Sequence, residues 1–198
     1  MQRIFLIALA AFIFVVVATI GRVYMVDNNG GMATNAGSVK LGGPFSLVDH
    51  TGKAVTDEDY RGKYMMIYFG YTYCPDVCPT SLSLMADALE LLTPDQLDKV
   101  VPIFITVDPE RDTPEALSTY VTHFHDKMVG LSGTIEQTKQ VARAYRAFYQ
   151  KVGEDGSDEY LMDHSSTTYV IGPDGKYATH FGHATPGDAM AKRLAEIL

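Results

Sequence analysis

The chain has 198 residues, of which 46% are hydrophobic and 20% are charged, values that are typical of a globular domain with room for an appendage. Its 24 acidic residues outnumber 16 basic ones, which gives a net charge of −8. Because nucleic-acid binding relies on an excess of basic side chains, this balance argues against a nucleic-acid partner.

The first 25 residues are predicted to form a membrane anchor. Residues 4–20, IFLIALAAFIFVVVATI, contain no charged side chain. A helix of this length spans about 25 Å, and Arg22 and Tyr24 would extend it to the headgroups. A cleaved signal peptide is the alternative, but the run ends in only a poor small-residue cleavage site. The segment also lacks the Arg- and Ser-rich character of a mitochondrial transit peptide, which favours a single-pass helix in a bacterial membrane.

Residues 26–39 are predicted to be a flexible linker. This stretch is polar and rich in glycine, and it shows no apolar periodicity. The folded domain is therefore expected over residues 40–198.

After the linker, strand-like and helix-like segments alternate. Apolar and aromatic runs predict strands at residues 45–48, 64–69, 100–107, 167–171 and 177–181. Capping residues and apolar spacing predict helices that begin near Pro79, Pro114, Thr134 and Pro186. This order predicts an α/β fold, with a mixed sheet layered with helices.

Both cysteines of the chain lie in one stretch, YFGYTYCPDVCPT, as Cys74 and Cys78. A disulfide across so short a loop would stabilise the fold only a little. The pair also lies between a predicted strand and the start of a helix, where backbone N–H groups and the helix dipole lower the pKa of a thiol. This placement favours reactive or metal-binding cysteines.

The spacing of the cysteines leaves both redox and metal chemistry open. On a helix, Cys74 and Cys78 would share one face with Cβ atoms about 5–6 Å apart, close enough to bind one metal ion or to form a disulfide. Structural zinc usually takes four ligands and the chain has no further cysteine. Two soft sulfur ligands joined by an imidazole suit copper instead.

Six histidines are available for such a site, at positions 50, 123, 125, 164, 180 and 183. His123 and His125 are two residues apart on a predicted helix and so point to different faces, and His50 lies in a predicted turn. Spacing alone leaves His164 and the pair His180 and His183 about equally supported.

Other residues near these motifs have two interpretations each. Asp76 and Asp108 are candidates for hydrogen bonds to the ligands, but they also fit ordinary turn and strand-end positions. Met162 is a soft sulfur near His164 that fits a core position better. The aromatic cluster of Tyr68, Phe69, Tyr71 and Tyr73 is expected to pack the sheet, and the alternative for its odd-numbered members is a docking surface.

Three motifs together resemble the SCO/SenC family of membrane-anchored, thioredoxin-like proteins, which are implicated in copper delivery to cytochrome c oxidase. They are YFGYTYCPDVCPT at 68–80, VDPERDTP at 107–114 and DHSSTTYVIGPDGK at 163–176. The resemblance implies a thioredoxin-like fold and a site for Cu(I) or Cu(II) whose ligands match Cys74, Cys78 and His164. It also implies a folded domain in the periplasm, held at the bacterial inner membrane.

The resulting hypothesis is a copper metallochaperone, rather than an enzyme, that serves the dinuclear copper centre of cytochrome c oxidase. Its expected partners are the copper-bearing oxidase subunit and either another copper chaperone or a thioredoxin-like reductase. The alternative is a thiol-disulfide reductase in which Cys74 and Cys78 act on the cysteines of the oxidase copper site. A copper-dependent redox sensor and a thiol peroxidase are weaker hypotheses.

Overall fold

A computed structural model describes residues 41–153 and 159–198 of the chain. The chain divides into two units, Met1–Val39 and Lys40–Leu198, and the described residues belong to the second. The anchor over residues 1–25 and the linker over residues 26–39 lie outside the described part and stay predictions. Within that part, no helix has the length and apolar character that crossing a membrane requires.

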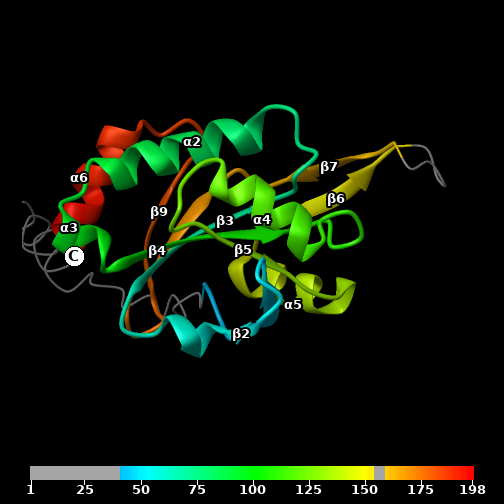
Figure 1. Ribbon diagram of the computed structural model, residues 1–198, viewed down its shortest axis with the longest axis horizontal. Helices are drawn as coiled ribbons and strands as arrows, with labels where there is room; N and C mark the ends of the chain where they lie inside the picture. The colour runs from blue at the N-terminus through cyan, green and yellow to red at the C-terminus, as the bar shows by residue number, and fades with distance from the viewer. Residues whose placement is uncertain (1–40, 154–158) are drawn as a thin grey trace, which may run out of the picture. The chain divides into compact units, whose positions relative to one another are not determined.

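The described strands form one mixed sheet of seven strands and a separate two-stranded sheet (Figure 1). The larger sheet has the spatial order β2-β1-β5-β4-β3-β8-β9, with β3, β4 and β5 parallel and the other pairs antiparallel. Its strands are β1 (Ser46–Asp49), β2 (Ala54–Thr56), β3 (Tyr64–Gly70), β4 (Val100–Thr106), β5 (Val129–Ser132), β8 (Thr168–Ile171) and β9 (Tyr177–Phe181). The smaller sheet is the antiparallel pair β6 (Tyr149–Val152) and β7 (Leu161–His164).

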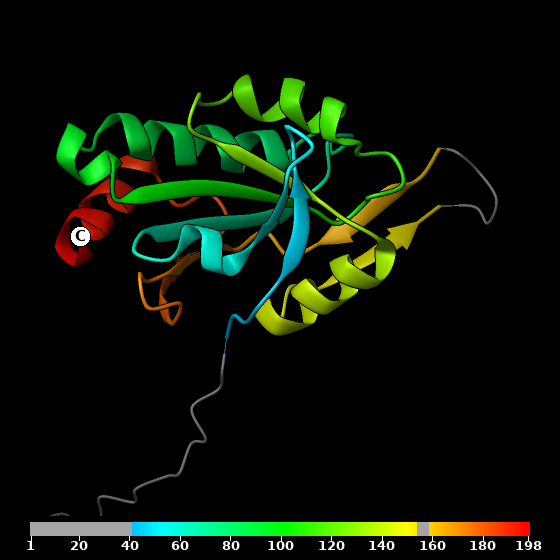
Figure 2. The same ribbon diagram turned by 60° about the horizontal axis from the view of Figure 1, so that its bottom comes forward.

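Helices cover both faces of the larger sheet. They are α2 (Val77–Glu90), α3 (Pro94–Leu97), α4 (Pro114–Thr122), α5 (Ile135–Tyr145) and α6 (Gly187–Ile197), together with the 3-10 turn η1 (Asp57–Tyr60). Figure 2 shows α2 and α4 on one face and α5 on the opposite face. The predicted mixed α/β sheet flanked by helices is thus confirmed.

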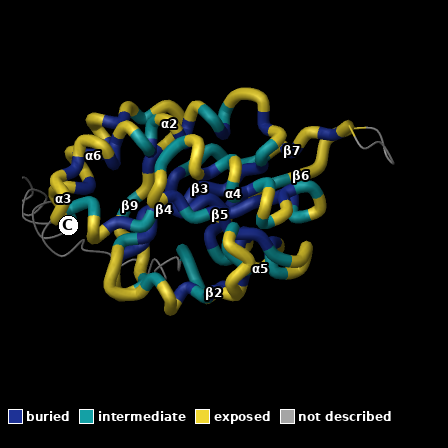
Figure 3. Tube along the Cα trace, viewed as in Figure 1, coloured by how far each residue is buried: buried dark blue, intermediate teal, exposed yellow. Residues whose placement is uncertain are grey.

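Strand β3 is buried on both faces, as its unbroken apolar run predicts. The five residues from Met65 to Phe69 are at most 1% exposed, and the central strands appear as the buried part of the trace in Figure 3. Successive side chains point to opposite faces. The hydroxyl of Tyr68 donates to the carbonyl of Val77 in α2 (3.4 Å), whereas the ring of Phe69 packs on Tyr145 of α5 with centroids 5.5 Å apart.

The helix after the cysteine motif begins two residues before its predicted start at Pro79. Cys78 therefore lies in the first turn of α2, while Cys74 lies in the loop that precedes it. Pro79 is tolerated because the N–H groups of a first helical turn have no partner within the helix. The two cysteines do not share one helical face, so the spacing argument for their proximity does not apply.

Four short strands were not predicted, namely β2, β5, β6 and β7. Strand β5 has only four residues, too few for a clear periodicity, and it is identified by its pairing between β1 and β4. Strand β6 is mostly exposed and lacks an apolar run. His164 is the last residue of β7, a strand that the apolar pattern did not predict.

Helix α6 approaches α2 closely at Gly187. A Cβ atom built at this position would lie 2.7 Å from the Cβ of Asp87 and 3.1 Å from the backbone nitrogen of Ala88. The glycine therefore permits the contact between the two helices.

We predict that Gly187→Ala lowers the free energy of unfolding by about 1–3 kcal/mol, because α6 must move away from the backbone of α2. The measurement is urea unfolding followed by circular dichroism. Gly182→Ala is the control, since a Cβ at Gly182 has no atom within 4 Å. Equal unfolding midpoints for the two variants would contradict the prediction.

Candidate metal site

Two loops begin side by side at one edge of the sheet, and one of them carries Cys74. Strands β3 and β4 are parallel, and Gly70 at the end of β3 lies opposite Thr106 at the end of β4. The loop after β3 carries Cys74, and the loop after β4 runs through residues 107–113. Because parallel strands end at the same edge, the sheet places both loops side by side.

The structure brings Cys74, Cys78 and His164 together. The two Sγ atoms and a ring nitrogen of His164 all lie within 4.8 Å of one another. Sγ of Cys78 is 3.2 Å from Nε2 of His164. Both cysteines are free thiols. Within residues 41–153 and 159–198 no other group of three His, Cys, Asp or Glu side chains is placed to hold a metal ion.

The ring of His164 is oriented by its own strand end. Nδ1 lies 3.0 Å from the carbonyl oxygen of Ser165 and donates its hydrogen there, which turns Nε2 toward the sulfur atoms. The rings of Tyr68 and Tyr71 pack edge-on against the imidazole, with centroids 6.1 and 5.8 Å away. A backbone carbonyl thus orients the second ring nitrogen.

The pKa values of the two cysteines are shifted in opposite directions. The backbone N–H of Cys78 donates to Sγ of Cys74 (3.4 Å). The side chain of Cys78 lowers the pKa of Cys74 most, and His164 and the backbone N–H groups of the helix start add to this effect, despite the burial of the thiol. Burial raises the pKa of Cys78, and the nearby Cys74 adds to this effect. Both shifts favour the thiolate form at Cys74 and the thiol form at Cys78.

Gly70 leaves room for the buried sulfur. A Cβ atom at this position would lie 2.6 Å from Sγ of Cys78 and 2.9 Å from the ring of Phe104. Cys78 itself is completely buried. A glycine at the end of β3 is therefore required for the observed position of this sulfur atom.

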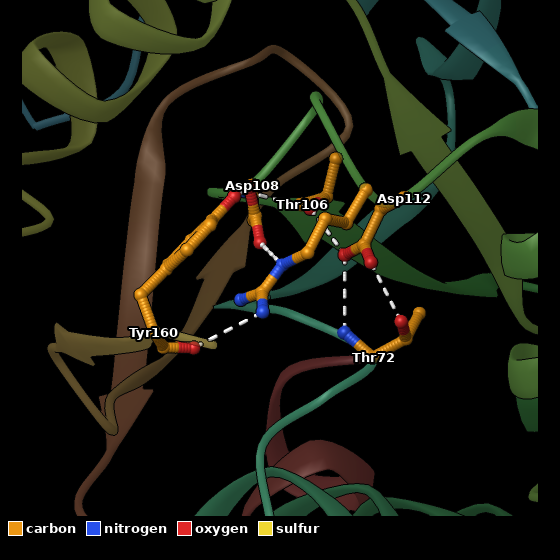
Figure 4. A network of polar contacts seen from close by, with 6 residues as sticks. Thr72, Thr106, Asp108, Asp112 and Tyr160 are labelled. Atoms are coloured by element: carbon orange, nitrogen blue, oxygen red, sulfur yellow. Dashed lines mark hydrogen bonds and ion pairs between the residues drawn. The ribbon is translucent and has the colours of Figure 1, made fainter. Parts of the chain in front are cut away.

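Asp112 fixes the loop that carries Cys74 (Figure 4). The backbone N–H and the hydroxyl of Thr72 donate to its two carboxylate oxygens (3.0 and 2.6 Å), and the hydroxyl of Thr106 donates a third hydrogen bond (2.5 Å). Asp112 is fully buried, and this burial raises its pKa. Asp112 was not among the predicted site residues, although its place in the motif VDPERDTP after a buried strand is a usable signal.

The other candidates from the sequence lie elsewhere. His180 is exposed on β9 beside Tyr177, and His183 is also exposed, so neither joins the group. Asp76 precedes α2 without a capping hydrogen bond from its side chain. Met162 belongs to the hydrophobic core.

The fold and the site together define a thioredoxin-like protein with a Cys–Cys–His group at the edge of its sheet. A family model described as SCO1/SenC matches residues 33–198. The chain belongs to the SCO1/SenC family.

Relatives and solved structures agree with this membership. The human mitochondrial SCO1 homologue is 49% identical over 162 residues, which cover 80% of this chain and 53% of that protein. An SCO2-like protein of Rickettsia conorii is 46% identical, with coverage of 81% and 77%. This chain thus spans about half the length of the human relative.

Two similar structures were solved with copper bound. ScoI of Arabidopsis thaliana is 42% identical with a TM-score of 0.71, and the match covers 79% of this chain and 98% of that one. ScoI of Bradyrhizobium japonicum is 41% identical with a TM-score of 0.73, and the coverage is 80% and 99%.

We predict that iodoacetamide labels Cys74 and spares Cys78 in the reduced, metal-free protein. An ordinary cysteine loses about tenfold of its thiolate per pH unit below a pKa near 8.5. Because its pKa is lowered, Cys74 should keep a nearly constant labelling rate between pH 8 and pH 6. Peptide mass spectrometry measures both sites, and labelling in guanidinium chloride, where both cysteines are exposed, is the control. A rate that falls with pH like that of an ordinary thiol would contradict the assignment.

Proposed function

We propose that this protein binds one copper ion through Cys74, Cys78 and His164. The observation that carries the proposal is the convergence of two sulfur atoms and one imidazole nitrogen within 4.8 Å. Thiolate and imidazole ligands suit copper, and a third cysteine or second histidine that would favour structural zinc is not part of this group. The copper-bound structures of the Arabidopsis and Bradyrhizobium proteins support copper as the metal.

We further propose that the bound copper is cargo and that the protein is a metallochaperone. Cys74 is 8% exposed, whereas Cys78 is fully buried. An incoming thiolate would therefore replace Cys74 first, and the ion would pass to the acceptor by stepwise ligand exchange. The family resemblance supports the dinuclear copper centre of cytochrome c oxidase as the destination, with the copper-bearing subunit as the partner.

The proposed location is the bacterial inner membrane. Residues 1–25 would anchor the chain, residues 26–39 would act as a linker, and residues 40–198 would lie in the periplasm. Such a tether raises the effective concentration of the domain near a membrane-embedded acceptor.

Copper binding can be tested with the reduced full chain in mild detergent and a chromophoric Cu(I) chelator as competitor. We predict one copper per chain in the wild type, and a loss of affinity of more than about 100-fold in Cys74→Ser, Cys78→Ser and His164→Ala, since each removes a ligand. His180→Ala and His183→Ala are matched controls that should bind normally. Full binding by His164→Ala, or no binding by the wild type, would refute the proposed site.

Gly70→Ala tests the same site while all three proposed ligands keep their side chains. The added methyl group must displace Sγ of Cys78, so we predict a loss of copper affinity of about 10- to 100-fold, the range typical of substitutions outside the ligand shell. The same chelator competition measures it, with circular dichroism to verify folding. Wild-type affinity in the folded variant would show that the position of this sulfur does not matter.

A second candidate function is thiol-disulfide reduction, favoured by the unequal pKa values of the two cysteines. The Cys74 thiolate would attack a disulfide of the acceptor, forming a mixed disulfide and releasing one thiolate. Cys78, after losing its proton, would attack Sγ of Cys74 and release the second thiolate. The acceptor gains two electrons, and this protein ends with a Cys74–Cys78 disulfide.

A substitution of His164 distinguishes copper delivery from thiol-disulfide reduction. Copper delivery requires the imidazole as a ligand, so His164→Ala should be as inactive as Cys74→Ser in loading an acceptor with copper. Dithiol exchange requires only the cysteines, so His164→Ala should retain most of the reduction of an acceptor disulfide. Acceptor reduction and acceptor metallation, measured side by side on both variants, distinguish the two candidates.

A further inference from the structure

The two-stranded sheet that carries His164 needs an attachment to the rest of the domain. Among the described residues, β6 and β7 pair only with each other and form no ladder with the larger sheet. Figure 1 shows the pair extending beyond the central strands. At its His164 end the hairpin continues into β8, and the N–H of Ser165 donates to the carbonyl of Phe148 (2.9 Å). At the opposite end of β7, side-chain contacts attach the hairpin to the loop after β4.

Arg111 and Asp108 supply such contacts at Tyr160, the residue directly before β7. Nε of Arg111 donates to Asp108 (2.5 Å), and Nη1 donates to the backbone carbonyl of Tyr160 (3.0 Å). The hydroxyl of Tyr160 donates to the other carboxylate oxygen of Asp108 (2.7 Å). Figure 4 shows Tyr160 reaching Asp108. Three hydrogen bonds thus close a ring between the loop after β4 and the start of β7.

Arg111 also touches the loop that carries Cys74. Its guanidinium carbon lies 3.6 Å from the ring centroid of Tyr160, 4.7 Å from that of Tyr73 and 5.8 Å from that of Tyr71. Tyr71 and Tyr73 precede Cys74, and the ring of Tyr71 also packs against His164. Arg111 is therefore held between the segment of the cysteines and the segment of the histidine by cation–π contacts with both.

Thr106 joins this group to the one around Asp112. Its hydroxyl donates to the Asp112 carboxylate (2.5 Å) and accepts the backbone N–H of Asp108 (2.9 Å). Asp108 is 2% exposed and Asp112 is fully buried. Charged hydrogen bonds are stronger and better defined in such an environment than at the surface.

We propose that residues 108–112 form a clamp that sets the distance between Cys74 and His164. Arg111 and Asp108 are positioning residues for His164 through Tyr160, and Asp112 is a positioning residue for Cys74 through Thr72. The role of the clamp in metal binding rests on the proposed copper site, whereas its mechanical role does not.

The contacts of the clamp with Tyr160 and its contacts with Thr72 can be removed by separate substitutions. Asp108→Asn combined with Arg111→Met removes the ion pair without leaving a buried charge unpaired, and Tyr160→Phe removes a single hydrogen bond. Thr72→Val removes the hydroxyl bond to Asp112. The control is Arg193→Met, because Arg193 forms an ion pair with Glu196 three residues away, as Arg111 does with Asp108, but on the exposed surface of α6.

Two readouts on the full chain in detergent follow the ligands. In the Cu(II) form, nitrogen coupling in the electron paramagnetic resonance spectrum reports His164, and thiolate-to-copper absorption reports the cysteines. In the metal-free form, amide hydrogen exchange reports the opening of β6 and β7.

We expect the double variant to lose nitrogen coupling, to keep thiolate absorption, and to lose about 10- to 100-fold in copper affinity. Exchange in β6 and β7 should accelerate while exchange in β8 is unchanged, with a smaller acceleration in Tyr160→Phe. Thr72→Val should show the opposite pattern, a changed thiolate absorption with the nitrogen coupling retained. Arg193→Met should match the wild type in every readout.

A folded double variant with wild-type spectra and wild-type exchange in β6 and β7 would overturn the proposal. If the double variant does not fold, unchanged exchange in Tyr160→Phe overturns it in the same way. If the wild type binds no copper, the proposed function fails, yet the exchange experiment on the metal-free protein still decides whether the clamp exists.

Discussion

Strands β3 and β4 pair in parallel up to Gly70 and Thr106, and the N–H of Val107 donates to the carbonyl of Gly70 (2.8 Å) one residue further on. This register is the constraint on which the site depends. Because Gly70 lies opposite Thr106, the loop of Cys74 and the loop of Asp112 leave the sheet at the same edge and directly beside each other. A slip of one residue would turn every side chain of β3 to the opposite face and would place Tyr68 and Gly70 away from α2.

The three residues of the site differ in burial: Cys78 is fully buried, whereas Cys74 and His164 are partly accessible to solvent. Sγ of Cys78 lies close to Gly70, at the buried start of α2. Cys74 lies in the loop before the helix, at the border of the solvent, and His164 is partly buried at the end of β7. One residue of the proposed site is thus fixed by the core, while the other two belong to segments that side-chain contacts hold in place.

The sequence was sufficient for the parts of the fold with a strong local signal. The unbroken apolar run of β3 and the capping threonines Thr113 and Thr134 mark their elements directly, and both helices begin where predicted. Strands β5, β6 and β7 were not predictable because they are short and are defined by their partners. The exposed side chains of β6 carry no apolar period at all.

The residues of the site also divide into those that the sequence predicts and those that only the structure reveals. Both cysteines stand out by their position between a strand and a helix, but local spacing did not separate His164 from His180 and His183. Only the three motifs taken together did so. The motif VDPERDTP after a buried strand marks Asp112 as a candidate, but its partner Thr72 lies 40 residues away, so its contact with the loop of Cys74 is seen only in the folded structure.

The separation of Cys78 and His164 by 86 positions along the chain has a consequence for the order of events in biogenesis. An unfolded chain offers a metal ion two neighbouring thiols but no imidazole at a defined distance. The third group of the proposed site is in place only after the parallel strands have paired and β7 has been attached, which are long-range and therefore late contacts in folding. A complete site is thus a property of the finished domain, and a metal ion that binds all three groups favours the native state over the unfolded chain. Loading would then discriminate between folded and unfolded copies, without any additional factor to inspect them.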